Sequence, residues 1–469
     1  MNYISTRGQA PVLGFEDALL QGLARDGGLY VPETWPVLGP GQIAGFAGRP
    51  FAEVAAEVIH PFTGGSIARS ELGAMAEEAY RGFAHPAVTP LVQIDTNTWI
   101  LELFHGPTLA FKDVAMQLLA RLMDQVLGKR NQRATIVGAT SGDTGGAAIE
   151  AFRASKRVDA VILFPEGRVS DVQRRMMTTP ADDNVHAVAI KGTFDDCQRL
   201  VKGLFNDHAF RDRVGLAAVN SINWARIVAQ VTYYFVAGAA LGAPHRAVTF
   251  SVPTGNFGDI FAGWVAKRMG LPVDWLVIAS NANDILPRAY VTGVYEMRDV
   301  VATSSPSMDI QISSNFERYL FEAQDRDAAA IRAQMASLEQ GGRFEMKNAL
   351  LEMRNDFDAA AASEEEVAAA IRHVRARSGY LMDPHTACGY VALDKCLDQG
   401  GTPRVILATA HPAKFPDAMA LFTRERPALP PRLVSLLTGD ERYPVLANDL
   451  AAVEAHVALC ARAVREGAA

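Results

Sequence analysis

The spacing of apolar residues along the chain changes near residue 95. Before this point, segments such as "FEDALLQGLA" and "SELGAMAEEAYRGF" carry apolar residues three and four positions apart, which is the spacing of helices with one buried face. The turn-rich segment "DGGLYVPETWP" lies between them. This pattern predicts a mostly helical N-terminal region over residues 1–95.

Beyond this region, short apolar runs alternate with segments of helical spacing, which is typical of parallel sheets with crossover helices. Between residues 285 and 380 the alternation gives way to loops and to helices rich in Ala, Glu and Arg, one of them starting at a capping box of Ser363 and Glu366. We expect an α/β fold with two open parallel-sheet domains, the smaller over 96–220 and the larger over 221–469. The runs expected as strands are 98–104, 133–140, 158–165, 184–190, 247–255, 273–280 and 404–410.

One predicted helix begins within "HGPTLAFKDVAMQLL", which holds the first lysine of the chain. Apolar residues recur at helical spacing from Phe111 to residue 127, and Gly128 follows as an expected helix stop. Lys112 then lies in the first turn, at the edge of the apolar stripe. The helix dipole and burial beside Phe111 both favour its neutral amine, the form that attacks a carbonyl. A lysine that extends its charge out to solvent is the alternative.

Three loops follow the ends of predicted strands. The segments "GATSGDTGG" (138–146) and "PTGNFGD" (253–259) each lead into a helix, and their small residues leave backbone N–H groups free to bind a carboxylate or a phosphate. A plain tight turn is the alternative for each. In the third loop, "ATAHPAKF", Thr409 lies at a strand end, where its hydroxyl could instead cap a backbone group. Ligands of open parallel sheets bind at this edge.

Composition excludes several classes of function. A net charge of −7 and a pI of about 5.9 argue against a nucleic-acid or anionic-membrane partner. No run approaches the roughly 18 uncharged apolar residues that span a bilayer, and the N-terminus does not resemble a secretory signal. The four cysteines form no CxxC pair and the ten histidines form no HExxH motif. We therefore expect a cytoplasmic protein with unpaired thiols and no metal.

The order of several segments is more specific than any one of them. The chain contains "HGPTLAFKD", "TSGDTGGAA", "NSINWARI", "GNFGD", "SSNFER" and "TAHPAKFP", after an opening "YISTRG" and "DGGLYVP". Together they resemble the threonine synthase family, which belongs to the tryptophan-synthase β-like (fold type II) enzymes that use pyridoxal phosphate (PLP). The similar segments run from residue 3 to about 416 and are closest to the longer bacterial and fungal branch.

The resemblance implies a role for each matching residue. Lys112 would bind PLP covalently and act as the catalytic acid and base, and Thr409 would face the pyridine nitrogen. The cofactor's phosphate would be held by Gly255, Asn256, Phe257, Gly258 and Asp259. The substrate would be bound by Thr140, Ser141, Gly142, Asp143, Thr144, Asn220, Ser221 and Arg226.

Within this set, the 140–144 loop would take the substrate's carboxylate, with Asp143 facing the ring oxygen of the cofactor. Many relatives of this fold class have asparagine there, which makes the Asp143 contact the weakest part of the match. Arg226, with Asn220, Ser221 and Thr144, would bind the substrate's phosphate, because a guanidinium offers two parallel N–H donors.

The activity implied is the conversion of O-phospho-L-homoserine and water to L-threonine and phosphate. The alternative is a phospho-lyase that releases 2-oxobutyrate and ammonia from the same substrate, which the motifs do not rule out, since only the addition of water differs. A non-enzymatic binding protein that keeps the fold is a third reading, opposed by the presence of Lys112, Thr409 and the glycine loop. A monomer is expected, with a dimer as the alternative.

Overall fold

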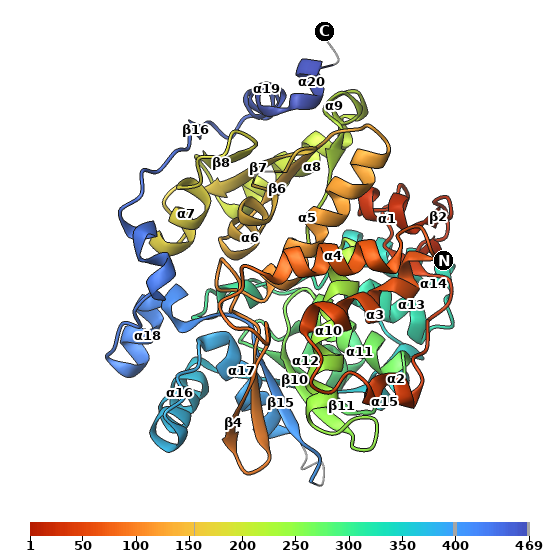
Figure 1. The fold of residues 1–469 in the computed structure, drawn as a ribbon, viewed down its shortest axis with the longest axis vertical. Coiled ribbons are helices and arrows are strands. Elements are labelled where there is room, and N and C mark those ends of the chain that lie inside the picture. Colours follow the sequence, from red (N-terminus) through yellow and green to blue (C-terminus); the bar gives the residue numbers. More distant parts are fainter. Residues whose placement is uncertain (154, 397–400, 467–469) are drawn as a thin grey trace.

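The computed structural model describes residues 1–153, 155–396 and 401–466. Its described part contains two parallel sheets, each flanked by helices, with the N-terminal region packed against both (Figure 1). The predicted α/β class with open parallel sheets and a helical N-terminal region is confirmed.

The larger sheet has six strands in the order β14-β11-β10-β15-β5-β4, parallel except for the edge pair β4 and β5. Its central strands are nearly continuous apolar runs, because helices cover both faces. Ile406 and Val277 pack with α17 (Pro384–Lys395) in one core cluster, whereas their neighbours Val405 and Leu276 pack with α11 (Gly258–Arg268) in another. The strands are β4 (Leu91–Asp95), β5 (Thr98–Glu102), β10 (Val248–Pro253), β11 (Val273–Ser280), β14 (Phe357–Ala361) and β15 (Arg404–Ala408).

The smaller sheet has five parallel strands in the order β16-β8-β7-β6-β9. All eight residues of β7 are buried, as expected for an inner strand covered on both faces. Its strands are β6 (Ala134–Ala139), β7 (Val158–Pro165), β8 (Val185–Ile190), β9 (Leu216–Ala217) and β16 (Val445–Leu446).

Helices surround both sheets. Those of the smaller sheet are α6 (Asp143–Phe152), α7 (Asp171–Thr178), α8 (Phe194–Asn206), α9 (His208–Val214), α19 (Leu450–Cys460) and α20 (Arg462–Glu466), while α5 (Lys112–Lys129) packs on α4, α6 and α10. Those of the larger sheet are α10 (Trp224–Ala240), α11 (Gly258–Arg268), α12 (Ile285–Thr292), α13 (Phe316–Ala323), α14 (Ala328–Gly341), α15 (Ala349–Asp356), α16 (Glu364–Ser378), α17 (Pro384–Lys395) and α18 (Pro416–Thr423). Short elements are η1 (Pro306–Met308), η2 (Pro412–Lys414), η3 (Pro431–Leu437) and the antiparallel pair β12 (Val294–Glu296) and β13 (Arg343–Glu345).

The N-terminal region contains a small sheet as well as helices. The antiparallel order β2-β1-β3 joins β1 (Asn2–Ser5), β2 (Leu13–Gly14) and β3 (Tyr30–Pro32), and the helices are α1 (Phe15–Gln21), α2 (Pro40–Ala44), α3 (Phe51–Thr63) and α4 (Arg69–Tyr80). Tyr3 ties this region to α10: its hydroxyl donates to the Phe62 carbonyl at 2.7 Å and accepts from Trp224 Nε1 at 3.1 Å. The region therefore shares one hydrophobic core with both of the large sheets.

The sheets cross the expected domain boundaries at two places. The strand β5, placed by sequence in the unit 96–220, pairs with β15 in the larger sheet. The C-terminal connection, residues 424–449, runs from α18 back to the smaller sheet, where β16 pairs with β8 (Figure 1). Sheet membership depends on pairing between distant segments, which chain order alone does not show. The division into domains at residues 96 and 221 stays a prediction.

The helix ends agree in part with those predicted from the sequence. The capping box of Ser363 and Glu366 starts α16 as predicted. The helix that begins at Lys112 runs to Lys129, past the expected stop at Gly128. The side chains of Cys197, Cys388 and Cys460 are buried, and that of Cys396 is partly buried. Over the described residues, no helix combines the length and apolar character needed to cross a membrane.

Candidate active site

The carboxyl ends of β6, β10 and β15 bring the three sequence-predicted loops to the start of α5. Lys112 Nζ lies 3.5 Å from Asp143 Oδ2, in the loop after β6. The Phe111 amide donates to the Thr409 carbonyl at 2.8 Å, in the loop after β15. Ser307 links the loop after β6 to the loop after β10. Its Oγ donates to Asp143 Oδ2 at 3.1 Å, and its carbonyl oxygen lies against Gly255.

Lys112 is buried, with 9% of its surface exposed, rather than extended to solvent. Its Nζ lies 4.8 Å from the centre of the Phe111 ring. Burial lowers the pKa of the amine against the opposing effect of Asp143, and the positive charges of Lys414 and Arg226 lower it further. The amine is thereby shifted towards the neutral form that a nucleophile or a general base needs.

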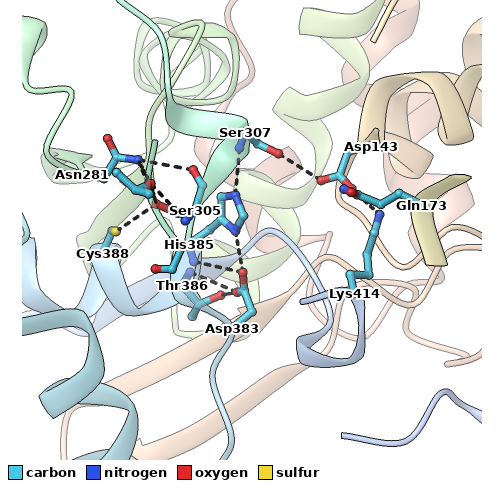
Figure 2. A network of polar contacts seen from close by, with 12 residues as sticks. Asp143, Gln173, Asn281, Ser305, Ser307, Asp383, His385, Thr386, Cys388 and Lys414 are labelled. Carbon is cyan, nitrogen blue, oxygen red and sulfur yellow. Dashed lines mark hydrogen bonds and ion pairs between the residues drawn. The ribbon is translucent and has the colours of Figure 1, made fainter. Parts of the chain in front are cut away.

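Asp143 is the centre of a buried polar network (Figure 2). Its Oδ1 lies 2.6 Å from Lys414 Nζ and accepts from Gln173 Nε2 at 2.8 Å, while its Oδ2 faces Ser307 and Lys112. Burial alone would raise the pKa of this carboxyl, but the charges of Lys414 and Lys112 hold it well below its usual range. Asp143 is therefore a carboxylate at neutral pH.

The 140–144 loop is shaped by two of its own members. The Thr140 hydroxyl accepts from the backbone N–H groups of Gly142 and Gly145, each at 2.9 Å, so it is used within the turn. Gly142 has a φ of +143°, and a Cβ there would lie 2.5 Å from Gln173 Cδ. Ser141 is exposed and Thr144 half-buried. The N-cap residue Gly142 has no side chain to cap α6, so the N–H groups of Asp143 and Thr144, which precede the bonded Gly145, are available to an anion.

The loop between β10 and α11 has the form of an anion cradle. Phe257 takes a left-handed conformation with a φ of 62°, and no side chain caps the helix that follows. A Cβ at Gly255 would lie 2.9 Å from the Ser307 carbonyl, and one at Gly258 would lie 3.2 Å from Asn315 Nδ2. The Asn256 carbonyl accepts from the backbone N–H of Asn315 at 3.0 Å, and this hydrogen bond helps to fix the loop. These close approaches suit a phosphate bound by backbone N–H groups.

The side chain of Asp259 is occupied elsewhere. Its Oδ1 accepts from the hydroxyls of Tyr233 at 2.5 Å and Tyr234 at 3.0 Å. Burial raises the pKa of this carboxyl to about 6, although both tyrosine hydrogen bonds lower it. Asp259 can thus serve a phosphate only through its backbone.

Arg226 is a buried cation whose only polar contact described is with the backbone. Its Nη1 donates to the Val219 carbonyl at 3.3 Å, and its Nε has no hydrogen-bond partner among the described residues. Burial lowers the pKa of its guanidinium to about 10. The preceding Asn220 is exposed, and the Ser221 carbonyl accepts from Asn315 at 3.1 Å. An unpaired buried guanidinium of this kind fits an anionic ligand.

Three residues of the network escaped the sequence prediction: Lys414, Gln173 and Ser307. Lys414 lies within the quoted segment "TAHPAKFP", but its pairing with Asp143 joins distant parts of the chain. Ser307 is held by His385, whose Nε2 accepts from the Ser307 amide at 3.2 Å while its Nδ1 bonds Asp383 at 2.7 Å (Figure 2). The described residues contain no group of three or more His, Cys, Asp or Glu arranged for a metal ion.

The family comparison first defines a class. A family model described as "Pyridoxal-phosphate dependent enzyme" matches residues 83–409, which include Lys112, the first two loops, Arg226 and Thr409. Two more models, "Threonine synthase N terminus" and "Threonine synthase, C-terminal", match residues 2–80 and 386–457. The chain belongs to the threonine synthase family within the PLP-dependent enzymes.

Individual relatives agree over nearly the whole chain. Threonine synthase from Pseudomonas aeruginosa is 52% identical, covering 97% of this chain and 98% of that one. The enzyme from Schizosaccharomyces pombe is 44% identical, covering 90% of this chain and 89% of its own. The crystal structure of PLP-bound threonine synthase from Brucella melitensis is 58% identical, with a TM-score of 0.96 over 98% of this chain and 100% of that chain.

Proposed function

We propose that this chain is a carbon–oxygen lyase that converts O-phospho-L-homoserine and water to L-threonine and phosphate. The observation that carries the proposal is the unpaired, buried guanidinium of Arg226 in the same site as the buried Lys112 amine. A phosphorylated amino acid offers an anion to the first and an amine-bearing carbon to the second. PLP, when bound, supplies an electron sink for that carbon.

The residues suited to hold PLP lie on three elements. Lys112 would carry the covalent bond, and the uncapped start of α11 after Gly255, Asn256, Phe257 and Gly258 would bind the cofactor's phosphate through backbone N–H groups. Thr409, which follows β15, would face the pyridine nitrogen. Its hydroxyl would not hold a proton on that nitrogen as a carboxylate would.

The substrate's two anionic groups have separate candidates. The uncapped N-terminus of α6, with Ser141, Gly142 and Thr144, would bind the carboxylate. Arg226, with Asn220 and Ser221, would bind the phosphate and stabilise it as it leaves the γ-carbon.

Proton transfer is assigned to Lys112. Its amine, shifted towards the neutral form by burial, removes the proton from the α-carbon of the substrate. This proton would pass to the bound cofactor, which frees the amine to take a second proton from the β-carbon and to return it at the γ-carbon after phosphate has left. Water then adds its hydroxyl at the β-carbon, and the two remaining protons, one from water and the one removed first, go to the α-carbon and to the leaving phosphate.

The product assay tests this proposal. Purified wild-type protein with PLP should release threonine and phosphate from O-phosphohomoserine in equal amounts. Lys112→Ala should abolish turnover. Lys129→Ala, at the exposed far end of the same helix, should leave it unchanged, since the polar contacts of Lys129 with the described residues are to Glu16, Glu71 and the Ser66 carbonyl. Phosphate released with 2-oxobutyrate and ammonia in place of threonine would replace the proposal with the phospho-lyase.

We also propose that the protein acts in the cytoplasm on a small molecule, without a nucleic-acid or membrane partner. The expected form is a monomer, which size-exclusion chromatography with light scattering distinguishes from a dimer.

A further inference from the structure

Asp143 lies between two lysines at unequal distances. Lys414 Nζ is 2.6 Å from Oδ1, whereas Lys112 Nζ is 3.5 Å from Oδ2. Lys414 is fully buried, and its Nζ also donates to the Thr108 carbonyl at 2.9 Å. Two amines therefore share one carboxylate in a largely buried site, and Arg226 adds a third positive group nearby.

The shorter contact determines which of the two lysines is charged. Attraction between opposite charges weakens with distance, so the carboxylate favours the ammonium of Lys414 over that of Lys112. A second ammonium at Lys112 would leave an uncompensated buried charge, which is costly. The other acid facing Lys112 is Asp259, whose carboxylate is bonded by Tyr233 and Tyr234.

We propose that Lys414 is a positioning residue. It keeps Asp143 ionised and forms an ion pair with its carboxylate, so that the Lys112 amine stays neutral and ready to accept a proton. The inference rests on the role proposed for Lys112. Gln173 and Ser307 complete the arrangement, because they hold the carboxylate with neutral donors at 2.8 and 3.1 Å and add no competing charge.

Removing Lys414 should reverse the balance. Oδ1 of Asp143 would keep only the Gln173 amide, and the nearest cation to the carboxylate would be Lys112 itself. The carboxylate would then favour an ammonium at Lys112. The pKa directions agree: the Lys414 charge lowers the pKa of Lys112, whereas Asp143 raises it.

The experiment measures the protonation of Lys112 directly. Cofactor-free, full-length protein is labelled briefly with isotopic acetic anhydride over a range of pH, and the extent at Lys112 is read by peptide mass spectrometry. In Lys414→Met the pH midpoint should rise by about 1–3 units, which slows labelling at neutral pH about 10- to 1000-fold. Lys414→Arg keeps the charge and should keep the wild-type midpoint within a few tenths of a unit.

A double variant separates charge from packing. In Asp143→Asn/Lys414→Met the carboxylate is gone, so the Lys112 midpoint should fall back to the wild-type value or below it. A purely structural role for Lys414 would not produce this reversal. Lys267→Met removes a lysine paired with Asp356 at 3.3 Å, away from the site, and should not shift the midpoint.

The pH profile of the holoenzyme gives an independent measurement. The acid limb of kcat should move upward in Lys414→Met and return in Lys414→Arg. An unshifted Lys112 midpoint in Lys414→Met, or an equal shift in Lys414→Arg, overturns the inference. Because labelling uses no substrate, its outcome is distinct from that of the product assay on the wild type, which tests the proposed function.

Discussion

Replacing Arg226 by methionine should make the protein more stable and a worse enzyme. The guanidinium is buried, with 3% of the residue exposed, and among the described residues it has one hydrogen bond, to the Val219 carbonyl. A buried charge without a carboxylate partner lowers the stability of the fold, and an apolar side chain of similar size removes that penalty. If Arg226 binds the substrate's phosphate, the same change removes the main contact to it.

The pKa of the guanidinium sets the size of the effect. Burial lowers this pKa from 12.5 to about 10, which corresponds to about 3 kcal/mol against the charged form at 1.4 kcal/mol per unit. The folded pKa lies below the unfolded one, so the cost is fully present below pH 10, including at pH 7. Losing the single hydrogen bond offsets about 1 kcal/mol. The net gain expected for Arg226→Met is therefore about 2 kcal/mol.

Denaturant unfolding of the holoenzyme, with and without inorganic phosphate, measures both the free energy of unfolding and the binding of phosphate. Phosphate at a hundred times its Kd should stabilise the wild type by about 2.7 kcal/mol and leave Arg226→Met nearly unchanged. Arg318→Met is the matched control, since Arg318 is also fully buried, with a pKa lowered to about 9 by burial. It donates to Tyr30 and Ile222 carbonyls and to Asn315, so its loss should destabilise the fold.

The reasoning fails if Arg226→Met unfolds at lower denaturant than the wild type without phosphate. It fails equally if the variant keeps the wild-type response to phosphate, since another residue would then bind the anion.

Two further variants test the site and the C-terminal connection. Gly142→Ala should lose about 1–3 kcal/mol and weaken substrate binding, because its φ of +143° is strained and its Cβ displaces Gln173; Gly146→Ala, with 3.5 Å of room, should be tolerated in the same unfolding and KM measurements. Hydrogen bonds from Arg174 lower the pKa of Glu441 from 4.5 to about 2, so the stability lost in Glu441→Gln should be largest above pH 4.5 and vanish as the pH falls to 2. A difference in unfolding free energy that does not change with pH would contradict this account.

Local patterns predicted the buried strands well. β7 and β11 span the predicted residues, because inner parallel strands are unbroken apolar runs. The strand β14 was missed, since "FDAAA" lies in an alanine-rich stretch and becomes a strand only by pairing with β11. The two-residue β16 has too short a pattern to recognise.

The sequence predicted the motifs of the site but not the contacts between its distant segments. The loops and Lys112 carry local signals, such as glycines after a strand and a lysine at a helix start, and they come together as expected. Lys414 carries no such signal, because its ion pair depends on a partner that folding brings from a distant segment. The roles of all the site residues, Lys112 and Arg226 included, stay predictions.

The strand order β10-β15-β5 affects when the site can form during synthesis. β15 lies between two strands that leave the ribosome earlier, so neither can complete its pairing until residues 404–408 emerge. The amide of Phe111, just before Lys112, then donates to the carbonyl of Thr409. A nascent chain therefore carries Lys112 for most of its synthesis without the buried surroundings that lower the pKa of its amine, and a prematurely terminated chain would lack the proposed site altogether.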